Sequence, residues 1–447
     1  MEAWWALLLF IAVTGVLMAG FPVAFTLGGV SLWFALIGYF TGWFDADFIA
    51  ALPNRLNGIL NNATLMAVPV FVFMGVVLEK AKLAESLLQN MAALLGRKKG
   101  GLGFALLIVG MLLAASTGIV GATVVTLGLL AMPVMQKNGY DPALSAGTIC
   151  ASGTLGQIIP PSIVLVLLGD VLSNAYQQAQ LRLHIFNPKT VSVQDLFMGA
   201  LIPGLILVVL YALYLLWVRI SSPQAMPEAN VTEKPPLLTI LKSLLPPLFL
   251  ILAVLGSIIS GVATPTEAAS VGSMGALLLA ALHQRLSVDT LKASLKETIK
   301  VTAMVFMILI GAALFSLVFK GFHGDEAVQA FLTQLPGGEV SALVLVMLIL
   351  FLLGFILDFI EITFVVIPIV GPILLMMGYD PVWLGIMIAI NLQTSFLTPP
   401  FGFALFYLRG VTDINSRDLY RGVMPFIALQ LLMLVVLFYF PQLVSLI

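Results

Sequence analysis

The sequence predicts an all-α membrane protein that crosses the bilayer many times and consists of two inverted-topology repeats. Of its 447 residues, 61% are hydrophobic and only 9% are charged, whereas a soluble domain carries about 25% charged residues. So few charges cannot cover a water-facing surface, so we expect lipid to surround the chain. The second observation is a set of landmarks that recur at one constant spacing, which indicates duplication.

Ten apolar segments are long enough to cross the hydrocarbon core. They lie at about 3–20, 22–42, 64–84, 142–178, 196–218, 246–262, 265–283, 299–320, 382–407 and 423–445. The first lacks the basic residues of a secretory signal and runs on too long, so we interpret it as a span with Trp4 and Trp5 as interfacial anchors. Two longer segments, about 101–136 and 340–376, are interrupted by glycine and polar residues and are predicted to be re-entrant hairpins.

Lysine and arginine predict the orientation, because cytoplasmic loops carry most of these residues. Four basic clusters occur: Arg97 to Lys99; Arg219, Lys234 and Lys242; Arg285, Lys292, Lys296 and Lys300; Arg409, Arg417 and Arg421. With two re-entrant hairpins, all four clusters fall on the cytoplasmic side. Both termini are then periplasmic, the first hairpin opens from the cytoplasm and the second from the periplasm.

The repeat is visible in three landmarks that share one offset. The motif GYDP begins at Gly139 and at Gly378, and 378 − 139 = 239; the Pro-Pro pairs begin at Pro160 and Pro399, again 239 apart, as are Pro133 and Pro372. A Pro-rich polar stretch, 221–236, marks the seam. We therefore assign 1–220 to the first repeat, 221–245 to a cytoplasmic linker and 246–447 to the second repeat. About sixteen extra residues, within 173–190, lengthen the first.

Each repeat has five spans and one hairpin. Because five is odd, the second repeat starts on the opposite face from the first, which is the inverted design of many secondary transporters. Sites in such proteins lie near the midplane, where discontinuous helices meet. The alternative is a duplicated bundle that serves only as a scaffold.

The Pro-Pro pairs predict two broken helices. Pro160 and Pro161 remove backbone donors, so the carbonyls of Gly153 to Gln157 should lose their partners and suit a dehydrated Na⁺. Hydroxyls and glycines surround this break, and the second break, which ends at Pro399 and Pro400, is richer in oxygens. The residues concerned are Ser152, Gly153, Thr154 and Gly156 in the first copy, and Asn391, Gln393, Thr394, Ser395 and Thr398 in the second. The alternative is a proline kink that serves packing.

The hairpin tips are the second candidate element. The first, ASTGIVGAT, places Ser116, Thr117, Gly118 and Thr123 between apolar arms, where half-helix N-termini suit a carboxylate. The second tip carries Asp358 and Glu361, three residues apart and therefore on one helical face. Charges at membrane depth cost several kcal/mol, so a functional role is expected. For Glu361 the alternative is a side chain that reaches the interface.

Four other charged residues receive weaker interpretations. Glu267, in ATPTEAA, is predicted to cap a helix N-terminus. Asp170 and Arg409 are equivalent positions, since 170 + 239 = 409. Arg409 could meet an anionic substrate or belong to the basic cytoplasmic belt. Arg55 lies in a short amphipathic stretch that could face a partner.

Several kinds of protein are disfavoured. One cysteine, Cys150, and three scattered histidines argue against a disulfide and against a Cys- or His-based metal site. No GxxxxGK[ST] loop and no HExxH motif occur, and no serine–lysine or paired-aspartate arrangement suggests an intramembrane protease. A net charge of −1 gives no hint of a nucleic-acid partner. The sequence therefore predicts binding and movement rather than an enzyme.

The runs PVFVFMG (69–75), GTLGQIIPPSIVL (153–165), GVATPTEAA (261–269) and TPPFGFALFYLRGV (398–411) resemble the large membrane subunit of tripartite ATP-independent periplasmic (TRAP) transporters. The resemblance spans nearly the whole chain. It implies an elevator-type transporter in the bacterial inner membrane, whose hairpins and broken helices move together. It also implies Na⁺ coupling, a small four-helix membrane subunit and a periplasmic substrate-binding protein that delivers an organic acid, usually a carboxylate.

The resemblance further implies about two Na⁺ sites by position. The first would combine Ser116 to Gly118 with Ser152 to Gly156, and the second would combine Asp358 with Asn391 to Thr394. Substrate contact or gating would involve Thr123, the two Pro-Pro pairs, Glu361, Thr398 and Arg409. This chain has no fused small subunit, so we expect that partner to be a separate chain. The main rival is a stand-alone Na⁺/carboxylate symporter; a channel is less favoured, because hairpins that open from opposite faces suit alternating access.

Overall fold

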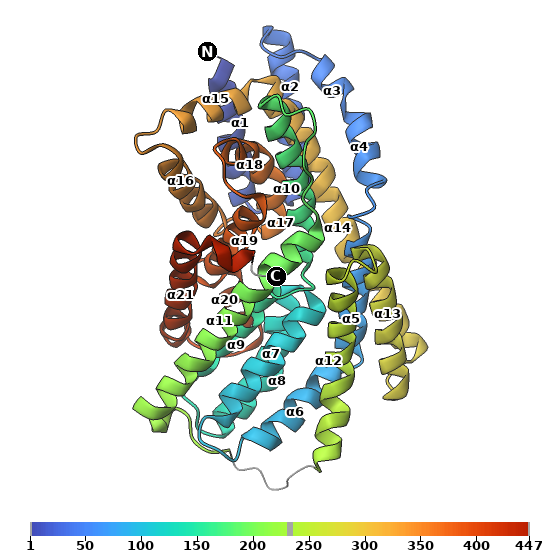
Figure 1. Cartoon of the computed structure of the whole chain (residues 1–447), viewed down its shortest axis with the longest axis vertical. Helices are drawn as coiled ribbons and strands as arrows, with labels where there is room; N and C mark the ends of the chain where they lie inside the picture. The colour runs from blue at the N-terminus through green and yellow to red at the C-terminus, as the bar shows by residue number, and fades with distance from the viewer. Residues whose placement is uncertain (1, 230–235, 446–447) are drawn as a thin grey trace. The chain divides into compact units, whose positions relative to one another are not determined.

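The computed structural model describes residues 2–229 and 236–445, and all its regular elements in these ranges are helical (Figure 1). Contacts divide the chain into two compact units, and we describe each by itself. The first comprises residues 1–66, 167–192 and 300–385, and the second 67–166, 193–299 and 386–447. Three helices, α10, α14 and α19, pass from one unit into the other.

Eight described helices are long and apolar enough to cross a membrane. They are Val23–Thr41, Val120–Lys137, Val193–Ser221, Leu241–Ile259, Pro265–Leu282, Val288–Gly321, Phe359–Met376 and Ser416–Tyr439. Four shorter apolar helices are Trp4–Met18, Gly101–Thr117, Gly338–Leu353 and Pro381–Leu397. The chain is therefore an all-α polytopic membrane protein; the predicted number of ten full spans stays a prediction.

The first unit begins with α1 (Glu2–Met18) and α2 (Val23–Thr41), followed by the short helices α3 (Asp47–Ala50) and α4 (Leu52–Leu60). α2 ends at Gly42, whose positive φ of 77° allows the left-handed cap that glycine favours. The unit continues with α10 (Ile163–Arg182), the larger part of α14 (Val288–Gly321) and α15 (Gly324–Thr333). An aromatic contact joins α1 to the residue that follows α14: Trp5 stacks on Phe322 with 5.8 Å between the ring centroids.

The segment 340–376 is a helix–turn–helix in the first unit, as the sequence predicts. Its first arm is α16 (Gly338–Leu353), and its second arm starts as α17 (Phe359–Glu361), widens into one π-helical turn (Ile362–Val366) and continues as α18 (Ile367–Met376). Residues 354–358 form the tip between the arms. Single π turns inside helices often occur at functional sites, and this one follows directly after the two acids of the tip.

The second unit contains the other hairpin and most of the remaining helices. They are α5 (Ala67–Lys80), α6 (Leu83–Leu95), α7 (Gly101–Thr117), α8 (Val120–Lys137), α9 (Pro142–Thr154), α11 (Val193–Ser221), α12 (Leu237–Ile259), α13 (Pro265–Leu282), α20 (Phe403–Val411) and α21 (Ser416–Tyr439), together with most of α19 (Pro381–Leu397). Small residues let helices approach closely, as membrane packing requires. A methyl group on Gly147 of α9 would overlap the carbonyl oxygen of Gly422 on α21.

The hairpin predicted at 101–136 is formed by α7 and α8, which run beside each other and turn at Gly118 (Figure 1). Gly118 has a φ of +62°, a conformation that other residues rarely adopt. At the open end, the Tyr140 hydroxyl accepts a hydrogen bond from the Leu102 N–H at 3.2 Å. Burial raises the pKa of Tyr140 above its usual range.

The linker after α11 packs across the open end of this hairpin. Its carbonyls at Ala225 and Met226 accept hydrogen bonds from the N–H groups of Asp141 (3.1 Å) and Gly100 (3.0 Å). The Met226 side chain is fully buried against Gly100 and Gly103. The predicted linker, 221–245, is therefore partly docked rather than free; residues 230–235, including Lys234, lie outside the described residues.

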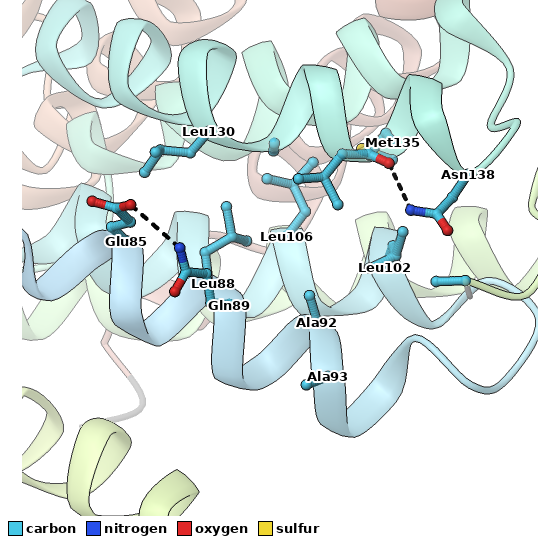
Figure 2. Close-up of a pocket in the computed structure, with 13 residues that line it drawn as sticks. Glu85, Leu88, Gln89, Ala92, Ala93, Leu102, Leu106, Leu130, Met135 and Asn138 are labelled. Carbon is cyan, nitrogen blue, oxygen red and sulfur yellow. Dashed lines mark hydrogen bonds between the residues drawn. The ribbon is translucent and has the colours of Figure 1, made fainter. Parts of the chain in front are cut away.

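A cavity of about 370 Å³ lies between α6 and the hairpin arms α7 and α8. Figure 2 shows its lining, in which alanine and leucine side chains predominate. Gln89 donates to the Glu85 carboxylate at 3.3 Å, and the Asn138 amide donates to the Val134 carbonyl at 2.8 Å. Because these polar groups bond to one another or to their own helix, we do not place the functional site here.

Three boundaries differ from the sequence prediction. α6 was not expected, because an amphipathic helix does not produce the continuous apolar run on which the spans were assigned. α12 begins at Leu237 rather than 246, and α14 begins at Val288 rather than 299. Lys242 in α12 and the charged residues in the first turns of α14 interrupt the apolar runs there. The predicted span 64–84 is shorter, since Lys82 adopts a positive φ of 54° between α5 and α6.

Candidate functional site

The first break lies where the paired prolines predict it. α9 ends at Thr154, a 3₁₀ turn covers Leu155–Gln157, and no helix follows until α10 begins at Ile163. The Pro160-Pro161 bond is cis. Every residue from 151 to 162 is buried. The chain therefore carries irregular backbone through the interior of the second unit, which is the setting in which a membrane protein tolerates it.

The prediction that all carbonyls from Gly153 to Gln157 lose their partners is wrong at two positions. The Leu155 carbonyl accepts hydrogen bonds from the N–H groups of Ile158 (3.1 Å) and Ile159 (2.9 Å). The Ser162 hydroxyl donates to the Gln157 carbonyl at 3.1 Å. The 3₁₀ turn and the serine after the prolines restore these bonds, so side-chain oxygens rather than these two carbonyls are the free acceptors.

The first hairpin encloses the break. α9 packs against both arms, and the 3₁₀ turn packs against α7. A methyl group on Gly153 would overlap Val124 of α8, and one on Gly156 would stand 2.9 Å from the Ala114 carbonyl oxygen of α7. The structure thus packs the first break against both arms of the hairpin. A common Na⁺ site formed by Ser116 to Gly118 and Ser152 to Gly156 stays a prediction.

The hydroxyls at the tip act as hydrogen-bond donors, so their oxygen lone pairs stay available. Ser116 donates to the Leu112 carbonyl at 2.7 Å, and Thr117 donates to the Leu113 carbonyl at 3.0 Å. The hydroxyls of Thr117 and Thr123 lie 2.8 Å apart. A hydroxyl that has used its hydrogen in this way still presents lone pairs to a cation.

Two side-chain oxygens at the break have no partner in the described residues. They are Ser152 Oγ and Gln157 Oε1, and both side chains are fully buried. Buried polar atoms are nearly always hydrogen-bonded, so an orphaned oxygen calls for a ligand. These donors fit Na⁺, which takes neutral oxygen ligands at broken helices. The side chain of Gln157 was not among the predicted site residues. An amide side chain three residues before the Pro-Pro pair could have indicated it in the sequence.

The second break lies between α19, which ends at Leu397, and α20, which begins at Phe403. Its Pro399-Pro400 bond is also cis. Thr394 donates to the Ile390 carbonyl and Thr398 to the Thr394 carbonyl, both at 2.7 Å. As at the first hairpin tip, these hydroxyls keep their lone pairs available.

The two breaks meet at equivalent positions. Gln393 Nε2 donates to Thr154 Oγ1 at 3.5 Å, and both side chains are fully buried. Since 393 − 154 = 239, these residues occupy the same place in the two repeats. Gln393 Oε1 has no partner among the described residues. The duplicated sequence landmarks thus correspond to a direct contact between the duplicated elements.

The two acids of the second tip form a capping box at the start of α17. Asp358 Oδ1 accepts from the Phe359 N–H at 2.7 Å, and Glu361 Oε2 accepts from the Asp358 N–H at 3.0 Å. Glu361 is only 6% exposed, which disfavours the alternative that it reaches the interface. Asp358 belongs to the first unit and Asn391 to the second, so a common Na⁺ site for them stays a prediction.

The other charged candidates have different surroundings in the structure. Glu267 is a helix cap as predicted, since its Oε2 accepts from the Thr264 N–H and hydroxyl, each at 2.8 Å. Arg409 is exposed at the end of α20. Asp170 and Arg55 line one cavity of the first unit. Within the described residues no group of three or more His, Cys, Asp or Glu side chains could hold a metal ion.

Comparison with known proteins decides the family. A family model described as "Tripartite ATP-independent periplasmic transporter, DctM component" matches residues 10–443. The chain belongs to this family. It is therefore a TRAP large permease subunit, a multi-pass inner-membrane protein and not an enzyme, and the resemblance drawn from the sequence is confirmed.

Two similar relatives come from Vibrio cholerae serotype O1. The C4-dicarboxylate TRAP transporter large permease protein DctM is 30% identical and covers 97% of this chain and 95% of its own length. The sialic acid TRAP transporter large permease protein SiaM is also 30% identical, with 96% and 95% covered. The Alcanivorax borkumensis YdaH transporter shares the fold of this permease, with a TM-score of 0.64, 18% identity and 90% of each chain covered.

Proposed function

We propose that this TRAP permease imports an organic acid that a periplasmic binding protein delivers, and that an inward Na⁺ gradient drives the import. The observation that carries the Na⁺ coupling is the pair of buried, partnerless oxygens, Ser152 Oγ and Gln157 Oε1, at a break enclosed by a hairpin. An apolar protein interior does not leave oxygens unpaired without cost, since each costs about 1–3 kcal/mol. A bound cation would remove that cost.

The chemistry of the donors favours Na⁺ over a divalent ion at the first break. The oxygens come from hydroxyl and amide groups, whereas Mg²⁺ and Ca²⁺ sites use carboxylates. When bound, Na⁺ would supply positive charge beside the hairpin tip. The residues of this chain would then hold the tip against the break, through Gly156 beside Ala114 and Gly118 beside Ile163. A methyl group on Gly118 would stand 3.2 Å from the Ile163 backbone nitrogen.

The anionic nature of the substrate has two supports. Relatives of this chain are named for C4-dicarboxylate and for sialic acid, both organic acids. Half-helix N-termini also begin beside the tips, at Val120 in α8 and Phe359 in α17, and such termini attract carboxylates. Thr123, Thr398 and the Pro-Pro pairs are proposed to shape or gate this path.

The family assignment supports two partners, which we propose to be a separate small four-helix membrane subunit and a periplasmic binding protein. We also propose that both termini are periplasmic and that the hairpins and broken helices move together in an elevator-type movement. The second Na⁺ site, with Asp358 and Asn391 to Thr394, belongs to the same proposal. The second candidate function is a stand-alone Na⁺/carboxylate symporter, which the same broken helices would support.

The test is uptake into proteoliposomes that contain this chain with its proposed small subunit. Radiolabelled sialic acid and succinate serve as probes, each with and without the proposed binding protein, under an inward gradient of NaCl or of KCl. We expect uptake only with NaCl and binding protein together. Equal uptake with KCl would refute Na⁺ coupling, and equal uptake without binding protein would favour the stand-alone symporter.

A further inference from the structure

The first unit contains a cavity of about 380 Å³ that the proposed Na⁺ sites do not use, and its mainly apolar wall carries several polar side chains. It lies between α4, α10, α14 and the second arm of the hairpin that contains α18. Six polar side chains line it: Arg55, Asn62, Asp170, Asn174, Gln178 and Ser316. Small-molecule sites have volumes of about 300–1,000 Å³ with a few placed polar groups, so both size and lining suit a small ligand.

Among the residues that the structure describes, Arg55 has no carboxylate partner. Its Nη1 donates to the Ser316 hydroxyl at 3.3 Å, and within the described residues it forms no ion pair. The side chain is only partly exposed. A guanidinium presents five donors in a planar fork that matches a carboxylate, and a single long bond to a hydroxyl leaves most of that fork unused.

Asp170, on α10, supplies the opposite charge in the same cavity. One of its oxygens, Oδ1, accepts from Asn62 Nδ2 at 2.8 Å. Asn62 is itself fixed, because its Oδ1 accepts from the Thr64 N–H at 2.9 Å. Asp170 is therefore held in place as an acceptor for hydroxyl or amino donors, and its charge repels a carboxylate.

α10 directs a stripe of polar side chains at this cavity. Asp170, Asn174 and Gln178 are four residues apart in sequence, so they follow one face of the helix, and all three line the cavity. The opposite face packs as core, with Leu172 fully buried. A cavity that served only packing would not need amides and a carboxylate at each turn.

We propose that this cavity binds a monocarboxylate that carries several hydroxyl or amino groups. Arg55 and Ser316 would hold the carboxylate, while Asp170 and the amides of α10 would accept and donate hydrogen bonds to the other groups. A second carboxylate beside Asp170 would meet a like charge in a partly desolvated site. The cavity should therefore discriminate against dicarboxylates. This inference rests on the proposed function in one respect: it takes the ligand of the cavity to be the organic acid that the permease transports.

The experiment measures ligand binding to the purified chain in detergent, without Na⁺, binding protein or vesicles. Potassium gluconate is the hydroxylated monocarboxylate, potassium succinate the dicarboxylate and sorbitol the neutral analogue, each against KCl at equal ionic strength. Binding is followed by the shift in melting temperature and by titration of tryptophan fluorescence. Failure of Na⁺ coupling would not affect this assay, so the two proposals are tested separately.

We expect saturable binding of gluconate and at least about tenfold weaker binding of succinate and sorbitol. Arg55→Gln should weaken gluconate binding at least about tenfold, and Arg55→Lys by less, because the charge remains but the fork is lost. Asp170→Asn should reduce the difference in binding affinity between gluconate and succinate. Arg285→Gln, which removes an exposed arginine outside this cavity, should bind gluconate as the wild type does.

Two results would overturn the proposal. One is succinate binding as tight as gluconate binding in the wild-type chain, or no binding of gluconate at all. The other is an Arg55→Gln variant that melts at a lower temperature but binds gluconate unchanged, which would show that Arg55 and Asp170 serve the fold only.

Discussion

Asp358 and Glu361 show how far single residues could be interpreted in advance. The cost of burying charge predicted a functional role for both. The structure adds a local role, because each carboxylate accepts a backbone N–H in the capping box that starts α17. Asp358 also accepts from the Glu361 backbone N–H within this box, and its role toward an ion stays a prediction.

The variant Asp358→Asn distinguishes the role of Asp358 as a helix cap from the role of its charge. Asparagine caps a helix about as well as aspartate, so the chain should stay folded. Loss of the charge should raise the Na⁺ concentration for half-maximal uptake by about tenfold, equivalent to about 1.4 kcal/mol. Uptake in proteoliposomes over a range of NaCl concentrations measures this. Asp289→Asn, at an exposed acid of α14, is the control, and wild-type Na⁺ dependence in Asp358→Asn would refute the assignment.

Other residues could not be found from the sequence. The polar character of Gln157 and Asn62 is visible, but their importance depends on neighbours. Gln157 stands out because no group in the described part of the chain bonds its side-chain amide. Asn62 stands out because it holds Asp170, 108 residues away in sequence. A local pattern predicts neither relation, since both arise from tertiary packing.

At the scale of elements, prolines and glycines predicted the two hairpins and the two breaks. These residues leave a local signature because they remove donors or allow positive φ. The docking of the linker left no such signature. Its bonds to Gly100 and Asp141 use backbone carbonyls of Ala225 and Met226, which any residue could supply.

The linker is predicted to stabilise the open end of the first hairpin. Met226→Ala removes a fully buried side chain from Gly100 and Gly103, which should cost about 2–5 kcal/mol. Thermal unfolding in detergent should show the loss, and the amide hydrogens of Gly100 and Asp141 should exchange faster. Met424→Ala, at a 55% exposed methionine of α21, is the control. Equal melting temperatures for the two variants would contradict a structural role for the linker.

At the scale of the whole molecule, the constant offset of 239 residues predicted the duplication. The contact between Gln393 and Thr154 joins equivalent positions, and YdaH shares the fold of this chain. The inversion of the repeats, the periplasmic termini and the elevator movement stay predictions. Orientation is a relation between the basic loops and the bilayer, so the packing of the chain by itself does not define it.

The most direct test of the account is equilibrium binding of radioactive Na⁺ to the purified chain. The two breaks predict about two saturable sites per chain. Ser152→Ala should lose about one of them, because it removes an orphaned oxygen of the first break. Saturable binding that falls in Ser152→Ala would support Na⁺ coupling at the broken helices. Na⁺ binding that is absent from the wild type, or that is identical in Ser152→Ala, would contradict it.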